Sequence, residues 1–233
     1  VHDALVIGGG LSGMTAALEL ANQGFTTHLV ERSDELGGNM KHIFYLLEET
    51  YQPQKEMAAI MDKVRTHPKI KVYTSTNIKV IEGSMGNFKT TLETQDGEVV
   101  FKHATVIVAP GAEEYKPKEY LFGQDSMVIT QVKFEEKIAR LTGIQPAAQT
   151  KVAPATAATK NKEMVTVSNP DLNKVNSVAM IQCVGSREKE HPSCSRICCS
   201  MAIKNALRFK KLKPSASVYV LYRDIRSYGF NEE

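Results

Sequence analysis

Short apolar runs and amphipathic stretches alternate along the first part of the chain. Residues 4–7 form an apolar run that ends in glycine, which predicts a buried parallel strand. Residues 12–22 carry apolar side chains at helical spacing and are followed by Gly24, a common helix stop. A second strand expected at 27–31 completes a strand, a helix and a strand, which together predict a βαβ unit.

The pattern then changes from helical spacing to strand-like runs. We expect a helix at 53–66, and Gln95-Asp96-Gly97 is a hairpin turn signal between two of the strands that follow. The strands expected in this region are 69–73, 78–81, 88–94, 98–102 and 105–109, the last of them buried and closed by Pro110-Gly111. The fold class expected is therefore α/β, with a small antiparallel β insert.

A stretch without periodicity follows at 143–162, rich in Ala, Thr, Pro, Gln and Lys, and it predicts a flexible insert or linker. A strand at 177–182, a helix at 195–211 and a strand at 217–222 then predict a second βαβ unit that ends just after its second strand. The regions expected are a first domain at 1–142, a flexible insert or linker at 143–175 and a partial second Rossmann-like domain at 176–233.

Composition excludes several classes of protein. An apolar fraction of 42% and a net charge of +3 are ordinary for a globular protein and predict no nucleic-acid surface. No apolar run approaches the ~20 residues that cross a bilayer, and no secretory signal is recognisable, so we expect a cytoplasmic protein without membrane insertion. Because the chain starts at Val1 and ends abruptly at Glu233, we expect it to be a piece of a longer polypeptide.

The sequence Gly8-Gly9-Gly10-Leu11-Ser12-Gly13 matches G-x-G-x-x-G between the first expected strand and the first expected helix. Glu31 closes the next strand, which completes the dinucleotide-binding fingerprint. Gly8 permits the tight turn, Gly10 lets the backbone approach a pyrophosphate, and Gly13 lets the helix pack close to the strand. The free N–H groups of the helix start, at Leu11 and Ser12, would face the phosphates. The alternative is a strand–helix turn that binds no ligand.

Two later segments favour FAD over NAD at this turn. Glu31-Arg32 leads into Leu36-Gly37-Gly38-Asn39, and the strand at 105–109 runs into Ala109-Pro110-Gly111. Both segments resemble those of the two-dinucleotide-binding flavoproteins, in which a Gly-Gly loop follows the acidic residue and an A-T-G element returns the chain to the nucleotide. Here proline replaces the threonine of that element, which removes a hydroxyl and an N–H group.

All 4 cysteines of the chain, Cys183, Cys194, Cys198 and Cys199, fall within one short segment with the spacing C-x10-C-x3-C-C. Four thiolates suit an iron–sulfur cubane, which tolerates irregular spacing. Structural zinc prefers two separated C-x2–4-C pairs, and a redox dithiol usually has the spacing C-x-x-C. Zinc, thiol–disulfide chemistry and unrelated buried cysteines stay open at this point. On a helix, Cys194 and Cys198 would share one face.

Three motifs resemble the A subunit of heterodisulfide reductase. They are Gln182-Cys183-Val184-Gly185-Ser186-Arg187-Glu188, Cys194-Ser195-Arg196-Ile197-Cys198-Cys199 with Ala202-Ile203-Lys204-Asn205-Ala206, and Tyr222-Arg223-Asp224-Ile225-Arg226-Ser227-Tyr228-Gly229-Phe230. The resemblance implies a thioredoxin-reductase-like core that holds FAD and a [4Fe-4S] cluster, the cluster on Cys183, Cys194, Cys198 and Cys199. It also implies anaerobic electron metabolism, as in methanogenesis, with flavin-based electron bifurcation in the full complex.

The resemblance implies partners as well. These are the other subunits of a heterodisulfide-reductase-like complex and electron carriers of the ferredoxin or hydrogenase type, and a homodimer is allowed. The fold class becomes a Rossmann-like two-dinucleotide-binding flavoprotein fold with an antiparallel β insert, truncated in the second domain. The segment that closes over the flavin in the wider family would follow the second domain, so FAD or the cluster can be absent from this chain alone.

Two further interpretations come from the residues of the second unit. Its turn, Cys183-Val184-Gly185-Ser186-Arg187, keeps one glycine where a nicotinamide-binding turn has three, so we expect a cluster in place of an NAD(P) pocket. Lys204, on the expected helix, can reach the flavin edge as a catalytic residue, and a solvated helix lysine is the alternative. The function expected is electron transfer between FAD and the cluster. The alternatives are an NAD(P)H-dependent disulfide reductase of the thioredoxin reductase type and a zinc-stabilised, non-catalytic assembly module.

Overall fold

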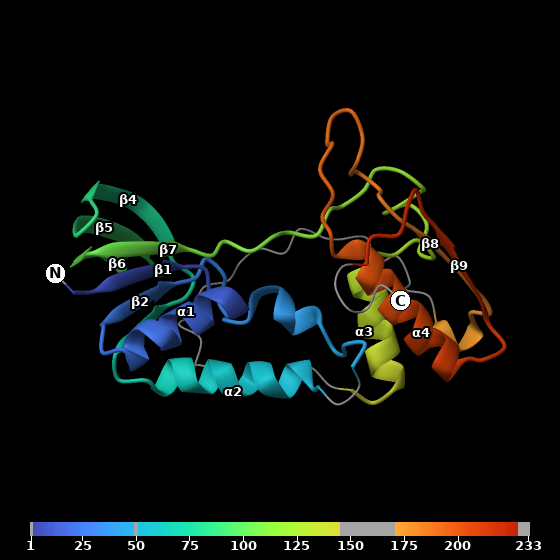
Figure 1. Cartoon of the computed structure of the whole chain (residues 1–233), viewed down its shortest axis with the longest axis horizontal. Helices are drawn as coiled ribbons and strands as arrows, with labels where there is room; N and C mark the ends of the chain where they lie inside the picture. Colours follow the sequence, from blue (N-terminus) through green and yellow to red (C-terminus); the bar gives the residue numbers. More distant parts are fainter. Residues whose placement is uncertain (1, 49–50, 145–170, 228–233) are drawn as a thin grey trace. The chain divides into compact units, whose positions relative to one another are not determined.

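A computed structural model describes residues 2–48, 51–144 and 171–227 of the chain. The chain divides into two compact units (Figure 1). Of the described residues, 2–43 and 51–113 belong to the first unit, and 44–48, 114–144 and 171–227 belong to the second. Most of the flexible insert expected at 143–175 lies outside the described residues.

The first unit contains the elements expected for residues 1–109, with small shifts at their ends. Its elements are β1 (Ala4–Ile7), α1 (Leu11–Asn22), β2 (Thr27–Val30), the 3-10 helix η1 (Gly38–His42), α2 (Pro53–Thr66), β3 (Ile70–Tyr73), β4 (Asn77–Ser84), β5 (Asn87–Thr94), β6 (Gly97–His103) and β7 (Thr105–Val108). Strands β1, β2, β3 and β7 form a parallel sheet in the order β3-β2-β1-β7. Strands β4, β5 and β6 form a separate antiparallel sheet. The α/β class and the antiparallel insert are therefore confirmed.

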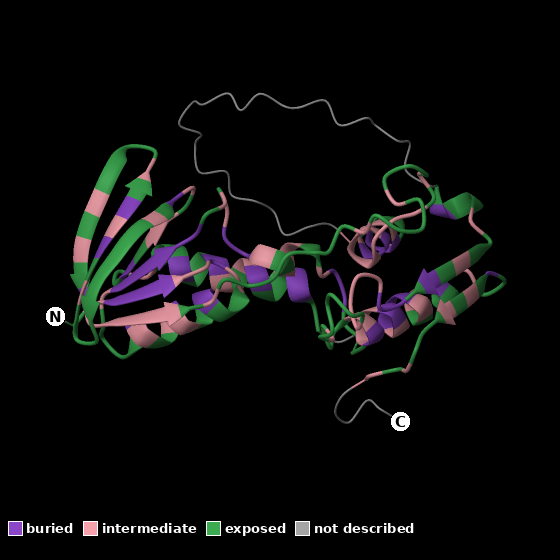
Figure 2. Ribbon diagram, turned by 90° about the horizontal axis from the view of Figure 1, so that it is seen from above, coloured by how far each residue is buried: buried purple, intermediate pink, exposed green. Residues whose placement is uncertain are grey.

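The parallel sheet has a different cover on each face. Val6 on β1 points into a core formed with α1 and α2, which lie along one side of the sheet (Figure 1). Leu5, its neighbour on the same strand, points into a second core with Leu92 of the antiparallel sheet. Both residues are fully buried, so β1 carries apolar side chains on both faces, as a central parallel strand does. Figure 2 shows that the inner strands of this sheet are mostly buried.

The prediction of a buried strand at 105–109 was wrong in one respect. Strand β7 is only partly buried, and Val108 is 66% exposed. The cause is its place at the edge of the sheet, where β1 is its only hydrogen-bonded neighbour among the described strands. An apolar run of four residues does not distinguish a central strand from an edge strand.

Two histidines are buried between the two sheets of the first unit. His28 on β2 stacks on Phe101, with ring centroids 3.8 Å apart, and its Nδ1 lies 3.2 Å from the Tyr73 hydroxyl. His103 on β6 has its Nε2 2.7 Å from Thr90 Oγ1. Burial lowers the pKa of both imidazoles below the ordinary value, although Asp3 beside His28 opposes that shift. Both rings are therefore held in the neutral form.

The buried histidines make the first unit sensitive to acid. In the unfolded chain they take up a proton as the pH falls through about 6.5, whereas the folded pKa values are lower. Stability is therefore full above about pH 6.5 and decreases below it, by at most about 1.4 kcal/mol per pH unit for each histidine, until the folded pKa is reached. Urea unfolding at pH 7.5 and 5.5, followed by circular dichroism, measures the loss.

A His28→Phe substitution should reduce this acid sensitivity, because it removes one of the two buried imidazoles. Equal pH dependence of stability in the variant and the wild type would contradict the assignment.

The second unit has a simpler plan. Its elements are α3 (Gln131–Leu141), the 3-10 helix η2 (Leu172–Lys174), β8 (Ser177–Ile181), α4 (Cys198–Leu212) and β9 (Ser217–Leu221). Strands β8 and β9 pair in parallel and are joined through α4, which confirms the second βαβ unit. Their inner residues pack with α3 and α4 around Phe134 and Phe209, whose ring centroids are 5.5 Å apart.

The hydrophobic pattern did not lead us to predict α3. The signals for it are Thr130, whose Oγ1 accepts a hydrogen bond from Lys133 N–H as an N-cap, and the buried Phe134 and Ile138 four residues apart. The helix was missed because charged residues occupy most of its remaining positions.

Candidate functional site

The glycine-rich turn connects β1 to α1 in the conformation that its sequence predicts. Gly8 has φ +106°, and a Cβ on it would lie 2.0 Å from the carbonyl oxygen of Ala109. A Cβ on Gly13 would lie 1.8 Å from the Gly8 carbonyl oxygen, so the helix packs directly on the turn. Both positions exclude any side chain for steric reasons, independently of a ligand.

Gly10 differs from its two neighbours in the motif. A Cβ on it would meet nothing within 4 Å, and its φ of −74° is open to any residue. Gly10 is the N-cap of α1 and has no side-chain cap, so the first N–H groups of the helix, at Leu11 and Ser12, have no intrahelical acceptors. Open space over Gly10 beside these donors is what an approaching phosphate group requires.

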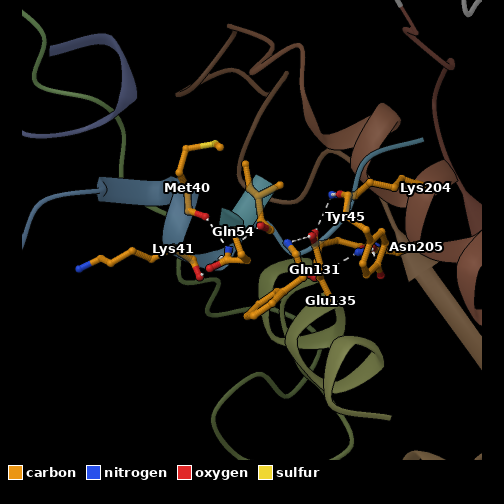
Figure 3. Close-up of polar contacts among 10 residues, drawn as sticks. Met40, Lys41, Tyr45, Gln54, Gln131, Glu135, Lys204 and Asn205 are labelled. Atoms are coloured by element: carbon orange, nitrogen blue, oxygen red, sulfur yellow. Dashed lines mark hydrogen bonds and ion pairs between the residues drawn. The ribbon is translucent and has the colours of Figure 1, made fainter. Parts of the chain in front are cut away.

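The Gly-Gly loop lies directly against this turn. Gly37 N–H donates to the Gly9 carbonyl over 2.8 Å, and Gly10 forms a parallel β-bridge with Gly37. Gly38 begins η1, which Gln54 of α2 holds by donating from Nε2 to the carbonyl oxygens of Met40 at 3.0 Å and Ile43 at 2.6 Å (Figure 3). Gln54 was not identified from the sequence.

Glu31 lies at the end of β2 and binds the glycine-rich turn itself. Its Oε2 accepts from Gly9 N–H over 2.6 Å, and its Oε1 accepts from the backbone and the hydroxyl of Ser33. Burial by itself would raise the pKa of this carboxyl, but the hydrogen bonds from Ser33 and Gly9 and the charge of Arg32 lower it below its ordinary value. The carboxylate is therefore ionised and fixed in place.

The third segment, after β7, joins the other two. Asn39 Nδ2 donates to the Ala112 carbonyl over 2.7 Å, and Arg32 forms an ion pair with Glu113 at 2.5 Å. Ala109 and Pro110 pack on Gly8, and Gly111 has φ +70° with open space around it. The structure thus brings together, within the first unit, all three segments that the sequence predicts for FAD.

The cysteine segment lies in the second unit and departs from one expectation. Cys183 follows β8 with φ +62°, but α4 begins only at Cys198, so Cys194 lies in the preceding loop and does not share a helical face with Cys198. Arg196 has φ +63°, a left-handed conformation that a right-handed helix cannot include. The predicted helix start at about residue 195 was wrong for this reason.

The sulfurs of three of these cysteines nevertheless accept hydrogen bonds. The donors are the Arg187 guanidinium to Cys183 at 3.9 Å, Arg196 N–H to Cys194 at 3.4 Å and the Ser195 hydroxyl to Cys198 at 3.4 Å. Burial raises the pKa of the Cys199 thiol, as do the neighbouring Cys198 and Cys183, while the Arg226 N–H acts in the opposite direction. Surrounding donors are what sulfur ligands of an iron–sulfur cluster require.

Within residues 2–48, 51–144 and 171–227, no three His, Cys, Asp or Glu side chains stand in an arrangement that could hold a metal ion. One buried donor near Cys183 lacks a partner. Gln182 is 8% exposed, and its Nε2 has no hydrogen-bond acceptor. Gln182 and Cys183 line a cavity of about 310 Å³ at the carboxyl ends of β8 and β9. As placed, the four sulfurs therefore do not form a site that fits a cluster, although Gln182 offers a buried donor without an acceptor beside Cys183.

Lys204 is not a solvated helix lysine; it is 8% exposed. Its Nζ forms an ion pair with Glu135 of α3 at 2.8 Å and donates to the Tyr45 carbonyl at 3.0 Å (Figure 3). Glu135 is fully buried and also accepts from Phe44 N–H over 2.8 Å. The next residue of α4, Asn205, accepts from the Tyr45 hydroxyl at 2.8 Å. The sequence contained no signal for Glu135, because its partner is far away along the chain.

Breaking this buried pair should destabilise the second unit strongly. We expect Glu135→Gln to reduce the free energy of unfolding by about 3–5 kcal/mol, because the Lys204 charge stays buried without its partner. Glu136, the next residue, pairs with Lys133 and Arg140 at the surface, so Glu136→Gln should reduce it by less than about 1 kcal/mol. Urea unfolding of the two variants and the wild type tests this, and equal losses would contradict it.

Comparison with known proteins agrees with this geometry. The sequence pattern of the pyridine nucleotide-disulphide oxidoreductases matches residues 2–142. The chain belongs to this family. Membership confirms the oxidoreductase class expected from the sequence, and it supports FAD as the cofactor of the glycine-rich turn.

Relatives over nearly the whole chain confirm the resemblance to the A subunit of heterodisulfide reductase. The iron-sulfur A subunit of the CoB–CoM heterodisulfide reductase of Methanopyrus kandleri is 27% identical over 98% of this chain and 44% of its own length. The A subunit of the ferredoxin:CoB-CoM heterodisulfide reductase of Methanosarcina acetivorans is 27% identical over 99% of this chain and 41% of its own. The chain spans less than half the length of these relatives.

Solved structures of similar fold agree with the fold class. Thioredoxin reductase from Lactococcus lactis superposes with a TM-score of 0.53 at 15% identity, over 98% of this oxidoreductase chain and 59% of its own. L-proline dehydrogenase from P. horikoshii gives 0.51 at 17% identity, over 99% of this chain and 37% of its own. Among the described residues, no helix combines the length and the apolar character that crossing a membrane requires.

Proposed function

We propose that this chain is the electron-transfer flavoprotein module of a heterodisulfide-reductase-like complex, passing electrons between FAD and a [4Fe-4S] cluster. FAD supplies two-electron redox chemistry that can be divided into single electrons, and the cluster supplies one-electron transfer. The turn at Gly8–Gly13, Glu31, the Gly37-Gly38 loop and Ala109-Pro110-Gly111 hold FAD. Cys183, Cys194, Cys198 and Cys199 hold the cluster.

The observation that carries the proposal for FAD is the contrast between Gly10 and the other motif glycines. Backbone atoms of the protein occupy the space beside Gly8 and Gly13 where a side chain would lie. Gly10 instead faces open space beside the start of α1. Glu31 is ionised and buried beside this space, where its carboxylate can accept from ribose hydroxyl groups. Gly37 contacts Gly9 and Gly10, and Gly38 lies beside Gly10. Asn39 donates to the Ala112 carbonyl and Arg32 pairs with Glu113, so these residues connect the later segments to the turn.

Hydrogen-bond donors around the cysteine sulfurs support the proposal for the cluster. The sulfurs of Cys183, Cys194 and Cys198 accept hydrogen bonds, and Gln182 offers a further buried N–H group that lacks an acceptor. As they stand the thiols do not form a metal site, so insertion of the cluster would require the loop between Cys183 and Cys198 to close around it. Three non-glycine residues of this loop, Cys183, Arg187 and Arg196, have positive φ, and rearrangement around a cluster can relieve the backbone strain that this conformation stores.

The second turn argues against a nicotinamide pocket. Gly185 is its one glycine, and the ring of Tyr115 lies so close that a Cβ on Gly185 would be 2.2 Å from Tyr115 Cε1. An aromatic ring therefore covers the backbone that a pyrophosphate would have to approach. We infer that electrons leave through the cluster as single electrons and not as hydride.

The alternative function is an NAD(P)H-dependent disulfide reductase, because the chain belongs to the pyridine nucleotide-disulphide oxidoreductases. It would need a pyridine nucleotide site in the second unit and a reactive cysteine pair, and Tyr115 disfavours the first of these. Lys204 remains proposed as a residue at the flavin edge. Within the second unit, Glu135 and the Tyr45 carbonyl already hold its ammonium group.

The full complex is proposed from the relatives alone. Those from Methanopyrus kandleri and Methanosarcina acetivorans are named as subunits of CoB–CoM heterodisulfide reductases, the second with ferredoxin in its name. We propose corresponding partner subunits and a ferredoxin-type carrier for this chain, and bifurcation as the activity of the assembled complex.

Anaerobic reconstitution of the full chain with FAD, iron and sulfide tests the proposal. We expect about one FAD, four iron and four sulfide per chain, and no rapid flavin reduction on addition of NADH. Stoichiometric zinc without flavin would favour the assembly module. Rapid bleaching of the flavin by NADH would favour the disulfide reductase and overturn the proposal.

A further inference from the structure

We propose that Ser33 is a positioning residue of the FAD site: it occupies one oxygen of the Glu31 carboxylate and leaves the other free for a single hydroxyl group of the adenosine ribose. The inference rests on the proposed function, because it deepens the role given there to Glu31. Glu31 directly follows β2, and Ser33 lies two residues further along the chain. Ser33 was not identified from the sequence.

The hydrogen bonds of the Glu31 carboxylate are shared unequally between its two oxygens. Oε1 accepts from Ser33 N–H at 2.8 Å and from the Ser33 hydroxyl at 2.6 Å. Oε2 accepts from Gly9 N–H at 2.6 Å. An ionised carboxylate has about four lone-pair sites, or about two on each oxygen. Ser33 therefore fills Oε1, whereas Oε2 keeps one acceptor position beside the glycine-rich turn.

The Ser33 hydroxyl has a choice of two acceptors. Its Oγ lies 2.6 Å from Glu31 Oε1 and 3.0 Å from the Glu35 carbonyl oxygen. A hydroxyl group has a single hydrogen to donate, and a bond to a carboxylate is shorter and stronger than a bond to a neutral carbonyl. The hydrogen is therefore assigned to Glu31, and the hydroxyl fixes the direction in which the carboxylate points.

The backbone that carries both residues is held from the segment after β3. Thr76 N–H donates to the Glu31 carbonyl at 3.1 Å, and Ser75 N–H donates to the Ser33 carbonyl at 2.8 Å. Ser75 has φ +50°, an unfavourable conformation for a residue with a Cβ, which persists where neighbouring contacts fix it. The carboxylate and its backbone are thus fixed before any ligand arrives, which lowers the entropic cost of binding.

The free acceptor position lies at the turn that is open to a ligand. A Cβ on Gly9 would lie 3.0 Å from Glu31 Oε2, and the neighbouring Gly10 faces open space. Glu31 is 9% exposed, so an acceptor position without a donor is costly there, and a ribose hydroxyl group can supply the donor. In the dinucleotide fingerprint the acidic residue binds the 2′-hydroxyl. One free position on Oε2 therefore predicts that affinity depends strongly on that one hydroxyl group.

Fluorescence titration of the full chain with FAD, and with the FAD analogue that carries 2′-deoxyadenosine, tests the inference. In the wild type we expect FAD to bind about tenfold more tightly than the analogue, because the analogue leaves a buried charged acceptor without its donor. In Ser33→Ala the carboxylate can turn away from the ribose, so this preference should fall to about threefold or less.

Two variants and one stability measurement separate positioning from folding. Ser33→Thr keeps the hydroxyl group and should keep the preference of the wild type. Ser84→Ala removes an exposed serine hydroxyl from β4 and should bind both nucleotides as the wild type does. Urea unfolding shows whether each variant is folded. A merely structural role of Ser33 would weaken the binding of both nucleotides in the same proportion, which leaves their ratio unchanged.

The possible outcomes distinguish this inference from the proposed function. An unchanged preference for FAD in a folded Ser33→Ala chain would overturn the positioning role. Equal affinity of the wild type for FAD and the analogue would also overturn it, while the FAD site itself would stand. A wild type that binds neither nucleotide would overturn the proposed FAD site, and this inference with it.

Discussion

Replacement of Cys199 by serine should abolish assembly of the cluster. Cys199 is 3% exposed and lies in the first turn of α4 beside Cys198, so it is the least exposed of the four thiols. Serine offers a hydroxyl of similar size that ligates iron poorly compared with thiolate. We expect bound iron and sulfide to fall at least about tenfold after anaerobic reconstitution, because the remaining three thiolates cannot complete a cubane.

The control for this experiment lies in the same loop. Ser195→Ala removes the hydroxyl that donates to Cys198 at 3.4 Å and leaves all four thiols in place, so it should retain the iron and sulfide content of the wild type. The stability of the metal-free chain should change little in either variant, which urea unfolding can check. Full iron and sulfide in the Cys199→Ser chain would contradict the assignment of the ligands.

The second large effect concerns the glycine-rich turn. In Gly13→Ala the new Cβ would lie 1.8 Å from the Gly8 carbonyl oxygen, and a backbone oxygen cannot move aside without opening the contact between α1 and β1. We expect a loss of more than about 4 kcal/mol in the free energy of unfolding. The variant should therefore lose FAD because the first unit no longer folds.

Gly10→Ala should leave the stability of the chain nearly unchanged and weaken the binding of FAD. Its Cβ meets no protein atom within 4 Å and its φ is ordinary, so stability should stay within about 0.5 kcal/mol of the wild type. The same methyl group would occupy the space over the turn, and FAD affinity should fall at least about tenfold, or 1.4 kcal/mol. Fluorescence titration of FAD beside urea unfolding measures both quantities. Unchanged affinity in a folded Gly10→Ala chain would show that FAD does not bind at this turn.

The different roles of the glycines show how far the motif can be understood from sequence. G-x-G-x-x-G predicts the strand–turn–helix geometry, and the positive φ of Gly8 and the tight contact of Gly13 agree with it. The motif gives no information on what lies opposite the turn. Ala109, Gly37 and Ala112 reach it from segments far along the chain, through pairings that depend on the register of the parallel sheet.

The cysteine segment also shows a limit of prediction from sequence, because its local spacing predicted a helix start that the structure does not have. Helical spacing placed Cys194 and Cys198 on one face, but the left-handed backbone at Arg196 delays the helix to Cys198. Local spacing cannot reveal such a turn, because its conformation depends on contacts with neighbouring segments. In the adjacent turn, Arg187 is held by Ser193 and by Arg223. Arg223 comes from the segment after the other strand of the pair.

The sequence alone is enough to predict the strands and helices other than α3, the α/β class, the dinucleotide fingerprint and the gathering of all thiols in one segment, since these depend on periodicity and on residue type. The tertiary contacts alone reveal which glycine is open to a ligand and that Lys204 is buried against Glu135. Those features arise from contacts between residues distant along the chain. Their energies depend on burial and on distance in space, which no local pattern of side chains records.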